Sequence, residues 1–123
     1  MLDPRITKLN DEQIEVGGII VSALAPGTRI IIKTKNNTYE ITVIKDNLVW
    51  VKGGRYFPNF VQRYFLGSTW GGSCLMLHWI GYGMHLEFTN APGRNVTTTA
   101  IRTAIIYGEG WSYDMGWSSN NEP

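Results

Sequence analysis

Short runs of apolar and β-branched residues, separated by glycine, asparagine and proline turn signals, fill the chain from residue 19 to residue 107. The first turns are expected at Pro26-Gly27, Asn36-Asn37 and Asp46-Asn47. The runs between them are rich in Ile, Val, Thr, Tyr and Trp, which suit a pleated surface. Further strands are expected over residues 60–66, 74–80, 84–88, 96–100 and 101–107.

The turns at Asn36-Asn37 and Asp46-Asn47 predict a register. A two-residue turn at Asn36-Asn37 sets charge against opposite charge on one face and aliphatic against aliphatic on the other, pairing Lys33 with Glu40, Ile32 with Ile41 and Ile30 with Val43. A two-residue turn at Asp46-Asn47 then places Trp50 opposite Val43, on the same apolar face. The two hairpins form a self-consistent meander.

This pattern predicts a single all-β domain over residues 19–107, a small barrel or sandwich of about seven to eight mostly antiparallel strands. Residues 1–18 are polar and mixed, and we expect a loose arm or a short helix there. Residues 108–123 show no strand pattern but contain two tryptophans, which disordered tails seldom hold. We expect this aromatic tail to dock on its own domain or on a neighbouring subunit.

Composition narrows the class of protein. A chain of 123 residues with 43% hydrophobic and 17% charged residues fits one globular domain, and a net charge of +1 argues against a duplex nucleic-acid partner. Five Trp and six Tyr exceed what a small core buries, so we expect some of them in a pocket or in the interface of a homo-oligomer.

The single Cys74 excludes an internal disulfide framework and a thiolate zinc cluster. The first residues contain no apolar signal segment, and no apolar run approaches the roughly 20 residues that span a bilayer. We therefore expect a cytoplasmic protein with no membrane partner.

An ordered set of motifs runs from residue 24 to residue 106: LAPGTRIIIKTKNNTYEI, VKGGRYF, GSTWGGS, GMHLEF and VTTTAI. This set resembles small uncharacterised bacterial all-β domain proteins that carry a G-S-x-x-G-G-S loop and a G-M-x-L-E-F strand. The chain departs from the resemblance at Thr99, where those proteins have serine. The resemblance implies a single β domain and no specific activity.

The segment GSTWGGS, residues 67–73, is the first candidate site. Glycines let backbone N–H groups converge on an anion, and hydroxyls add donors, here from Ser68, Thr69 and Ser73. Trp70 offers a flat face for stacking. The segment lacks P-loop spacing and precedes a strand, so the alternative is a wide turn or bulge of a barrel.

Four arginines lie beside aromatic residues, turns or threonines: Arg55, Arg63, Arg94 and Arg102. A guanidinium holds phosphate while a neighbouring ring, such as Tyr56, stacks on a base. We expect these residues to contribute to the same ligand site as the glycine loop. The alternative is that they are solvated side chains whose stems cover neighbouring rings.

A metal site is a further alternative. A two-residue turn at Gly81-Tyr82 would set His78 opposite His85, with Glu87 on the same face, and these are suitable ligands for zinc or iron. A three-residue loop would separate the histidines instead.

The sequence favours non-catalytic sensing or sequestration of a small anionic nucleotide-like ligand, for example a nucleotide second messenger, by a homo-oligomeric domain without a cofactor. No nucleophile elbow or carboxylate pair supports an enzyme. Two alternatives stay open: an assembly module without a small ligand, and a metal-dependent enzyme that uses His78, His85 and Glu87.

Overall fold

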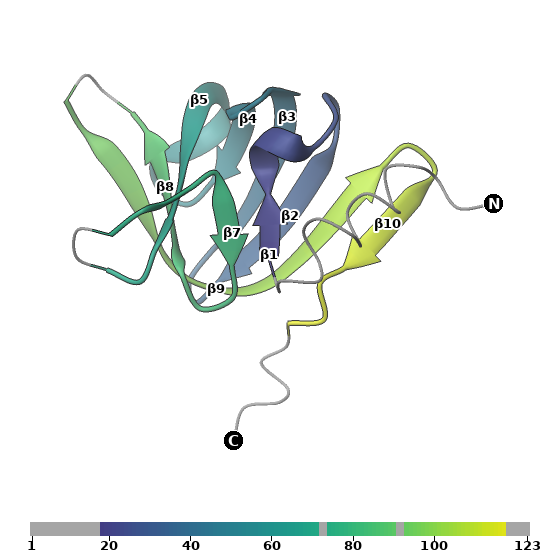
Figure 1. Cartoon of the computed structure of the whole chain (residues 1–123). Coiled ribbons are helices and arrows are strands. Elements are labelled where there is room, and N and C mark those ends of the chain that lie inside the picture. Colours follow the sequence, from purple (N-terminus) through teal and green to yellow (C-terminus); the bar gives the residue numbers. More distant parts are fainter. Residues whose placement is uncertain (1–17, 72–73, 91–92, 118–123) are drawn as a thin grey trace.

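A computed structural model describes residues 18–71, 74–90 and 93–117, and within these ranges the chain forms strands and one 3-10 turn (Figure 1). The elements are β1 (Gly18–Ile20), η2 (Val21–Ala23), β2 (Arg29–Thr34), β3 (Thr38–Lys45), β4 (Leu48–Gly53), β5 (Phe57–Thr69), β6 (Met76–Leu77), β7 (Trp79–Gly81), β8 (His85–Thr89), β9 (Asn95–Gly108) and β10 (Trp111–Asp114). The predicted all-β fold is confirmed. In the described part of the chain, no helix is long and apolar enough to cross a membrane.

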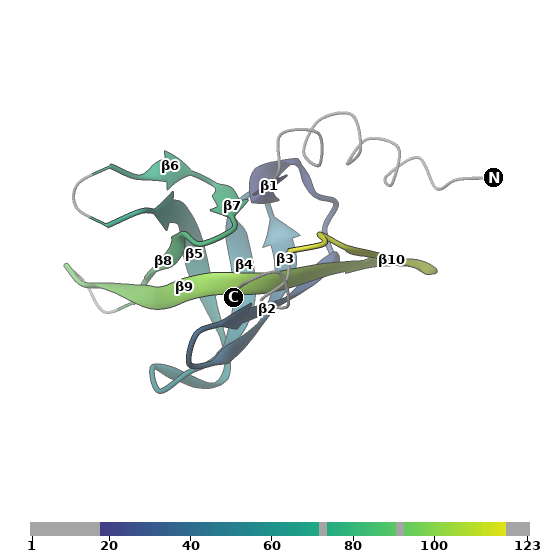
Figure 2. The ribbon, with the colours of Figure 1, turned by 90° about the horizontal axis from the view of Figure 1, so that it is seen from below.

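Six strands pair in a closed ring, which makes the fold a small barrel. Strands β2 to β5 form an antiparallel meander, β5 pairs with β8, β8 pairs with β9, and β9 returns to β2. Strand β10 continues the sheet beyond β9, and β6 pairs with the end of β5. A separate pair, β1 with β7, lies across one side of this ring (Figures 1 and 2).

Strand β9 closes the ring by bending. Its first half pairs with β8 and its second half with β2, and the register shifts once in each half, between His85 and Glu87 on β8 and between Lys33 and Thr34 on β2. A register shift of one residue exchanges the two faces of a strand. The long strand therefore turns from one wall of the barrel into the next without breaking.

The first hairpin differs from its predicted register by two residues. Lys33 faces Thr38 and Ile30 faces Ile41, because the turn residues are Lys35 and Asn36, one position earlier than expected. The Thr34 hydroxyl favours this turn, since it donates a hydrogen bond of 3.2 Å to the carbonyl oxygen of Asn37 and accepts one of 3.2 Å from the Asn37 backbone N–H. A shift of two residues preserves the faces, so the aliphatic side chains still point into the barrel.

The second hairpin has the predicted turn but a different face for Trp50. Lys45 pairs with Leu48 across Asp46-Asn47, and Asp46 adopts the positive φ of 54° that such a turn requires. A bulge between Val43 and Lys45 then shifts the register by one. Val43 consequently faces Val49, and Trp50 points outward with 40% of its surface exposed. The prediction that Trp50 faces the core is wrong.

The barrel interior is filled by inward side chains of every wall strand. Three phenylalanines form its aromatic part: Phe88 lies 5.7 Å from Phe57 in an edge-to-face arrangement and 5.4 Å from Phe65. Ile19, Val21 and Ile80 of the β1–β7 side are also fully buried and join the same cluster. The small sheet therefore completes the core that the ring encloses.

The segment from residue 74 to residue 80 was predicted as one strand and is two. His78 has a φ of 58° and separates β6 from β7, so the two short strands pair with different partners, β5 and β1. The tail is also not free of strands, because β10 forms a hairpin with β9. Trp111, Met115 and Trp117 are partly buried against the core cluster.

Candidate functional site

The hydroxyls of the glycine loop are used within the fold. Ser68 is fully buried in β5, and its Oγ donates a hydrogen bond to the carbonyl oxygen of Trp79. Thr69 Oγ1 accepts a hydrogen bond of 3.0 Å from the backbone N–H of Gly71 and closes a local turn. Both hydroxyls therefore form hydrogen bonds within the protein. Ser73 lies outside the described residues.

Trp70 of this loop, unlike the buried Ser68 and Thr69, is 69% exposed. Its ring lies over the β7–β8 turn, where a Cβ added to Gly83 would come within 3.3 Å of the indole. The structure therefore presents Trp70 as an accessible aromatic surface beside the β7–β8 turn.

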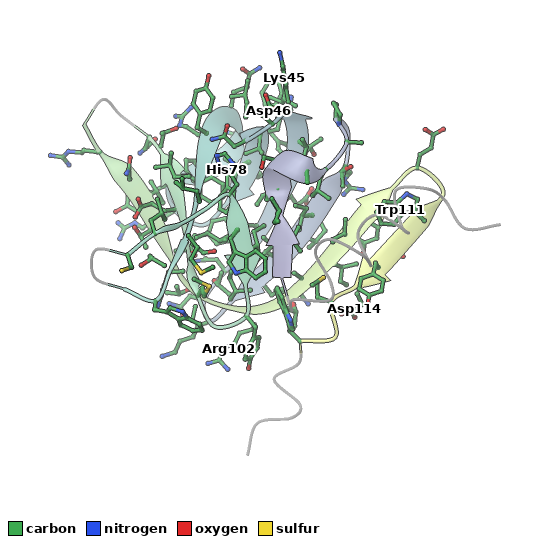
Figure 3. All side chains as sticks on the ribbon, in the orientation of Figure 1. Lys45, Asp46, His78, Arg102, Trp111 and Asp114 are labelled. Carbon is green, nitrogen blue, oxygen red and sulfur yellow. The ribbon has the colours of Figure 1, made fainter. Side chains whose placement is uncertain are left out.

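The predicted arginines occupy different parts of the wall. Arg63 is half-buried on β5 and donates to Asn90 Oδ1 from Nε (3.4 Å) and Nη2 (3.3 Å) and to the Gln62 carbonyl from Nη1 (2.7 Å), so it joins β5 to the β8–β9 connection. Arg94 lies exposed in that same connection, and Arg102 lies in β9 (Figure 3). Arg55 lies in the β4–β5 turn with its guanidinium 5.9 Å from the ring centre of Tyr56.

The histidine hairpin does not form. Strand β7 pairs with β1, and β8 pairs with β5 and β9, so His78 and His85 are not cross-strand neighbours. His85 Nδ1 lies 2.8 Å from the Thr98 carbonyl oxygen, and Glu87 accepts from Asn95 Nδ2 at 3.2 Å. Among the described residues no three His, Cys, Asp or Glu side chains form a group that could hold a metal ion. The predicted arrangement of His78, His85 and Glu87 is wrong, because residues 18–20 supply the partner of β7.

Three large rings lie on the outer face of β4 and β5. Trp50, Phe60 and Tyr64 are 40%, 44% and 51% exposed. Phe60 and Tyr64 are separated by four residues on β5 and so share one side of the strand. Trp50 pairs with Gln62, which lies midway between them. The rings therefore flank a common centre at Gln62.

One cation borders these rings, and a second lies in the adjoining turn. Lys52 Nζ lies 5.6 Å from the ring centre of Phe60, and Arg55 lies against Tyr56 in the turn that joins the two strands. Glu40 on β3 pairs with Lys52 in register, but its carboxylate lies 3.7 Å from the guanidinium of Arg29. We name this surface the β4–β5 aromatic face: Trp50, Lys52, Arg55, Tyr56, Phe60, Gln62 and Tyr64.

The β4–β5 turn, at the end of this face, packs on the buried side chain of Tyr39. Tyr39 is buried at the start of β3, and burial raises the pKa of its phenol, so the hydroxyl is neutral at physiological pH. Gly54 has a φ of 63°, and a Cβ there would lie 2.6 Å from that hydroxyl. The turn therefore packs closely on Tyr39, which fixes the position from which Arg55 and Tyr56 project.

Charge is segregated along the chain. Residues 18–71 carry seven Lys and Arg against two Asp and Glu, a net +5, whereas the rest of the chain carries a net −4. The overall charge of +1 hides this division. The positive part contains the whole β2–β5 wall, and so the aromatic face belongs to the electropositive half of the sequence, which favours an anionic partner.

No family model, no curated protein and no solved structure matches the chain. The resemblance to small bacterial β-domain proteins therefore stays a prediction, and the geometry of the described residues carries the functional argument.

Proposed function

We propose that this domain binds a small anionic nucleotide-like ligand without catalysis, and that it does so at the β4–β5 aromatic face. The observation that carries the proposal is the combination of exposed rings and cations on one outer wall and its adjoining turn: Trp50, Phe60 and Tyr64 with Lys52 on the wall, and Arg55 in the turn. A nucleotide consists of a flat base joined to a negatively charged phosphate. Its binding site therefore requires an aromatic ring and a cation side by side.

Sensing or sequestration is the role that fits such a domain. The face lies on a closed barrel whose strands hold the rings in place before a ligand arrives, and a preorganised site loses little conformational entropy on binding. A nucleotide second messenger is one ligand of this class. The proposal places the site on β4 and β5 and leaves Ser68 and Thr69 as structural residues.

The test compares two tryptophans. Replacing Trp50 with threonine removes a stacking surface but keeps a residue that suits a strand, and we expect affinity for a nucleotide to fall about 5- to 150-fold, the equivalent of one stacking contact. Replacing Trp70 with threonine is the matched control and leaves affinity unchanged. Both are measured by thermal shift and calorimetry against mononucleotides, cyclic dinucleotides and ADP-ribose.

Two results would contradict the proposal. If no nucleotide raises the melting temperature of the wild-type domain at millimolar concentration, the face binds no ligand of this class. If Trp70→Thr rather than Trp50→Thr abolishes binding, the ligand lies at the GSTWGGS loop instead.

We also propose that the domain associates with a second copy through the β5–β6 hairpin. Strand β6 exposes both of its residues, Met76 at 48% and Leu77 at 71%, and Trp70 projects from the same hairpin. A strand that is apolar and exposed on both sides is typical of a protein interface.

This association predicts that Leu77→Ser turns an oligomer into a monomer in light scattering. Phe60→Ser, which changes an exposed apolar residue on the other face, serves as the control and keeps the wild-type mass. A monomeric wild-type protein would refute this part of the proposal.

A further inference from the structure

The spacing of the exposed rings indicates more than one base in the ligand. A strand rises about 3.3 Å per residue, so Phe60 and Tyr64 lie about 13 Å apart along β5. Trp50 lies one strand away and opposite Gln62, at about 8 Å from each in the plane of the sheet. A single base covers one of these rings. Covering all three requires three bases.

The same spacing distinguishes single strands from duplexes. Successive bases in a duplex are about 3.4 Å apart, less than half the separation of the rings. Bases that remain stacked on one another therefore cannot each lie on a ring. An extended single strand has unstacked bases, and each base can stack on its own aromatic side chain.

The polar residues of the face suit such a chain. Gln62 lies among the three rings, where an amide can donate to and accept from base edges. Lys52 and Arg55 lie next to Phe60 and Tyr56 at the same end of the two strands, where they can neutralise phosphates. Arg63 is held by Asn90 and the Gln62 carbonyl, so we assign it no phosphate.

We propose that the β4–β5 aromatic face binds a short single-stranded oligonucleotide, with one base on each of Phe60, Trp50 and Tyr64 and with phosphates on Lys52 and Arg55. This inference rests on the proposed function and deepens it, since it replaces a one-base ligand by a three-base segment.

The experiment measures the affinity of the full chain for fluorescein-labelled oligothymidylates of one to six nucleotides, and of a duplex of the same length as the longest. Affinity is expected to rise about tenfold per nucleotide up to three and to level off beyond that. Phe60→Thr lowers the affinity for the trimer about tenfold and lowers the affinity for the mononucleotide less, because Trp50 still offers a stacking surface to a single base. Trp70→Thr is the control and changes neither value.

Salt dependence checks the phosphate contacts. With two phosphates neutralised, the logarithm of the association constant falls with the logarithm of salt concentration at a slope of about −1.4. Lys52→Ala reduces this slope to about −0.7, because one contact is lost. Lys35→Ala removes the same charge from the β2–β3 turn and leaves the slope unchanged.

Each contrary outcome has a defined meaning. If the mononucleotide binds as tightly as the trimer, the oligonucleotide inference fails while the proposed function stands. If no length binds, the inference fails, and the proposed function fails with it if no other nucleotide raises the melting temperature either. If the duplex binds as tightly as the single strand, the inference fails. If no oligonucleotide binds and Trp50→Thr changes the oligomeric state, the face is a protein interface and the inference is overturned.

Discussion

Replacing Phe88 with alanine is expected to lower the free energy of unfolding by about 3–5 kcal/mol, because the substitution removes a large buried ring and leaves a cavity. Phe88 is fully buried and contacts the rings of Phe57 and Phe65. It lies on β8, which joins β5 to β9 in the ring of strands. The loss therefore weakens the packing and the closure of the barrel together.

Denaturant unfolding, followed by tryptophan fluorescence, measures this change. Phe60→Ala is the matched control, since Phe60 is 44% exposed on the outer wall, and its expected cost is about 0.5 kcal/mol or less. Where Phe88→Ala does not fold, Phe88→Leu gives a smaller loss in the same direction. Equal costs for the two alanine variants would show that the three phenylalanines do not form the centre of the core.

Replacing Gly67 with alanine is the second large effect that we expect. Gly67 has a φ of 148°, and a Cβ there would collide with the carbonyl oxygen of Met76 on β6. The variant therefore combines backbone strain with a clash against main-chain atoms, and the free energy of unfolding should fall by about 3 kcal/mol or more.

Gly71→Ala separates these two causes. Gly71 also has a positive φ, 112°, but nothing lies within 4 Å of a Cβ at that position. Its substitution therefore costs only strain, about 1–3 kcal/mol. The difference between the two variants in denaturant unfolding reports the close approach of β5 and β6. Equal losses would mean that β6 moves aside without cost.

The strands and most of the turns could be predicted from the sequence because they depend on neighbouring residues. Asp46-Asn47 forms its turn where local conformational preference alone puts it. The turn of the first hairpin lies one position earlier than predicted because the Thr34 hydroxyl forms hydrogen bonds with the backbone of Asn37. These hydrogen bonds compete with the preference of Asn37 for a position in the turn. Each side chain of the hairpin still lies on its predicted face, since the register differs from the predicted one by an even number of residues.

The outward face of Trp50 could not be predicted in the same way. It depends on one bulged residue in β3, and nothing in the apolar pattern of that strand marks where the bulge lies. With Trp50 expected in the core, the sequence pattern gives Phe60 and Tyr64 no third ring beside them. Two signals in the sequence point to this face: the alternation of Phe60, Gln62 and Tyr64, and the positive charge of residues 18–71. The overall charge of +1 conceals the second signal.

The partner of β7 was missed for a different reason. Gly18 belongs to the pairing of β1 with β7, and it lies at the end of a segment expected to be an arm or a helix. A Cβ at Gly18 would collide with the ring of Trp79, so the glycine allows the two strands to approach. Pairing between segments about 60 residues apart leaves no periodic trace in either of them.

The bend in β9 also bears on how the chain leaves the ribosome. Residues 29–34 find their second neighbour only at residues 101–107, and β8 is completed by residues 95–100. Until that last long segment has been synthesised, the meander exposes one unpaired edge on β2 and another on β8. Such long-range closure is slow relative to hairpin formation. The nascent domain is therefore most prone to aggregation, and most in need of a chaperone, immediately before β9 emerges.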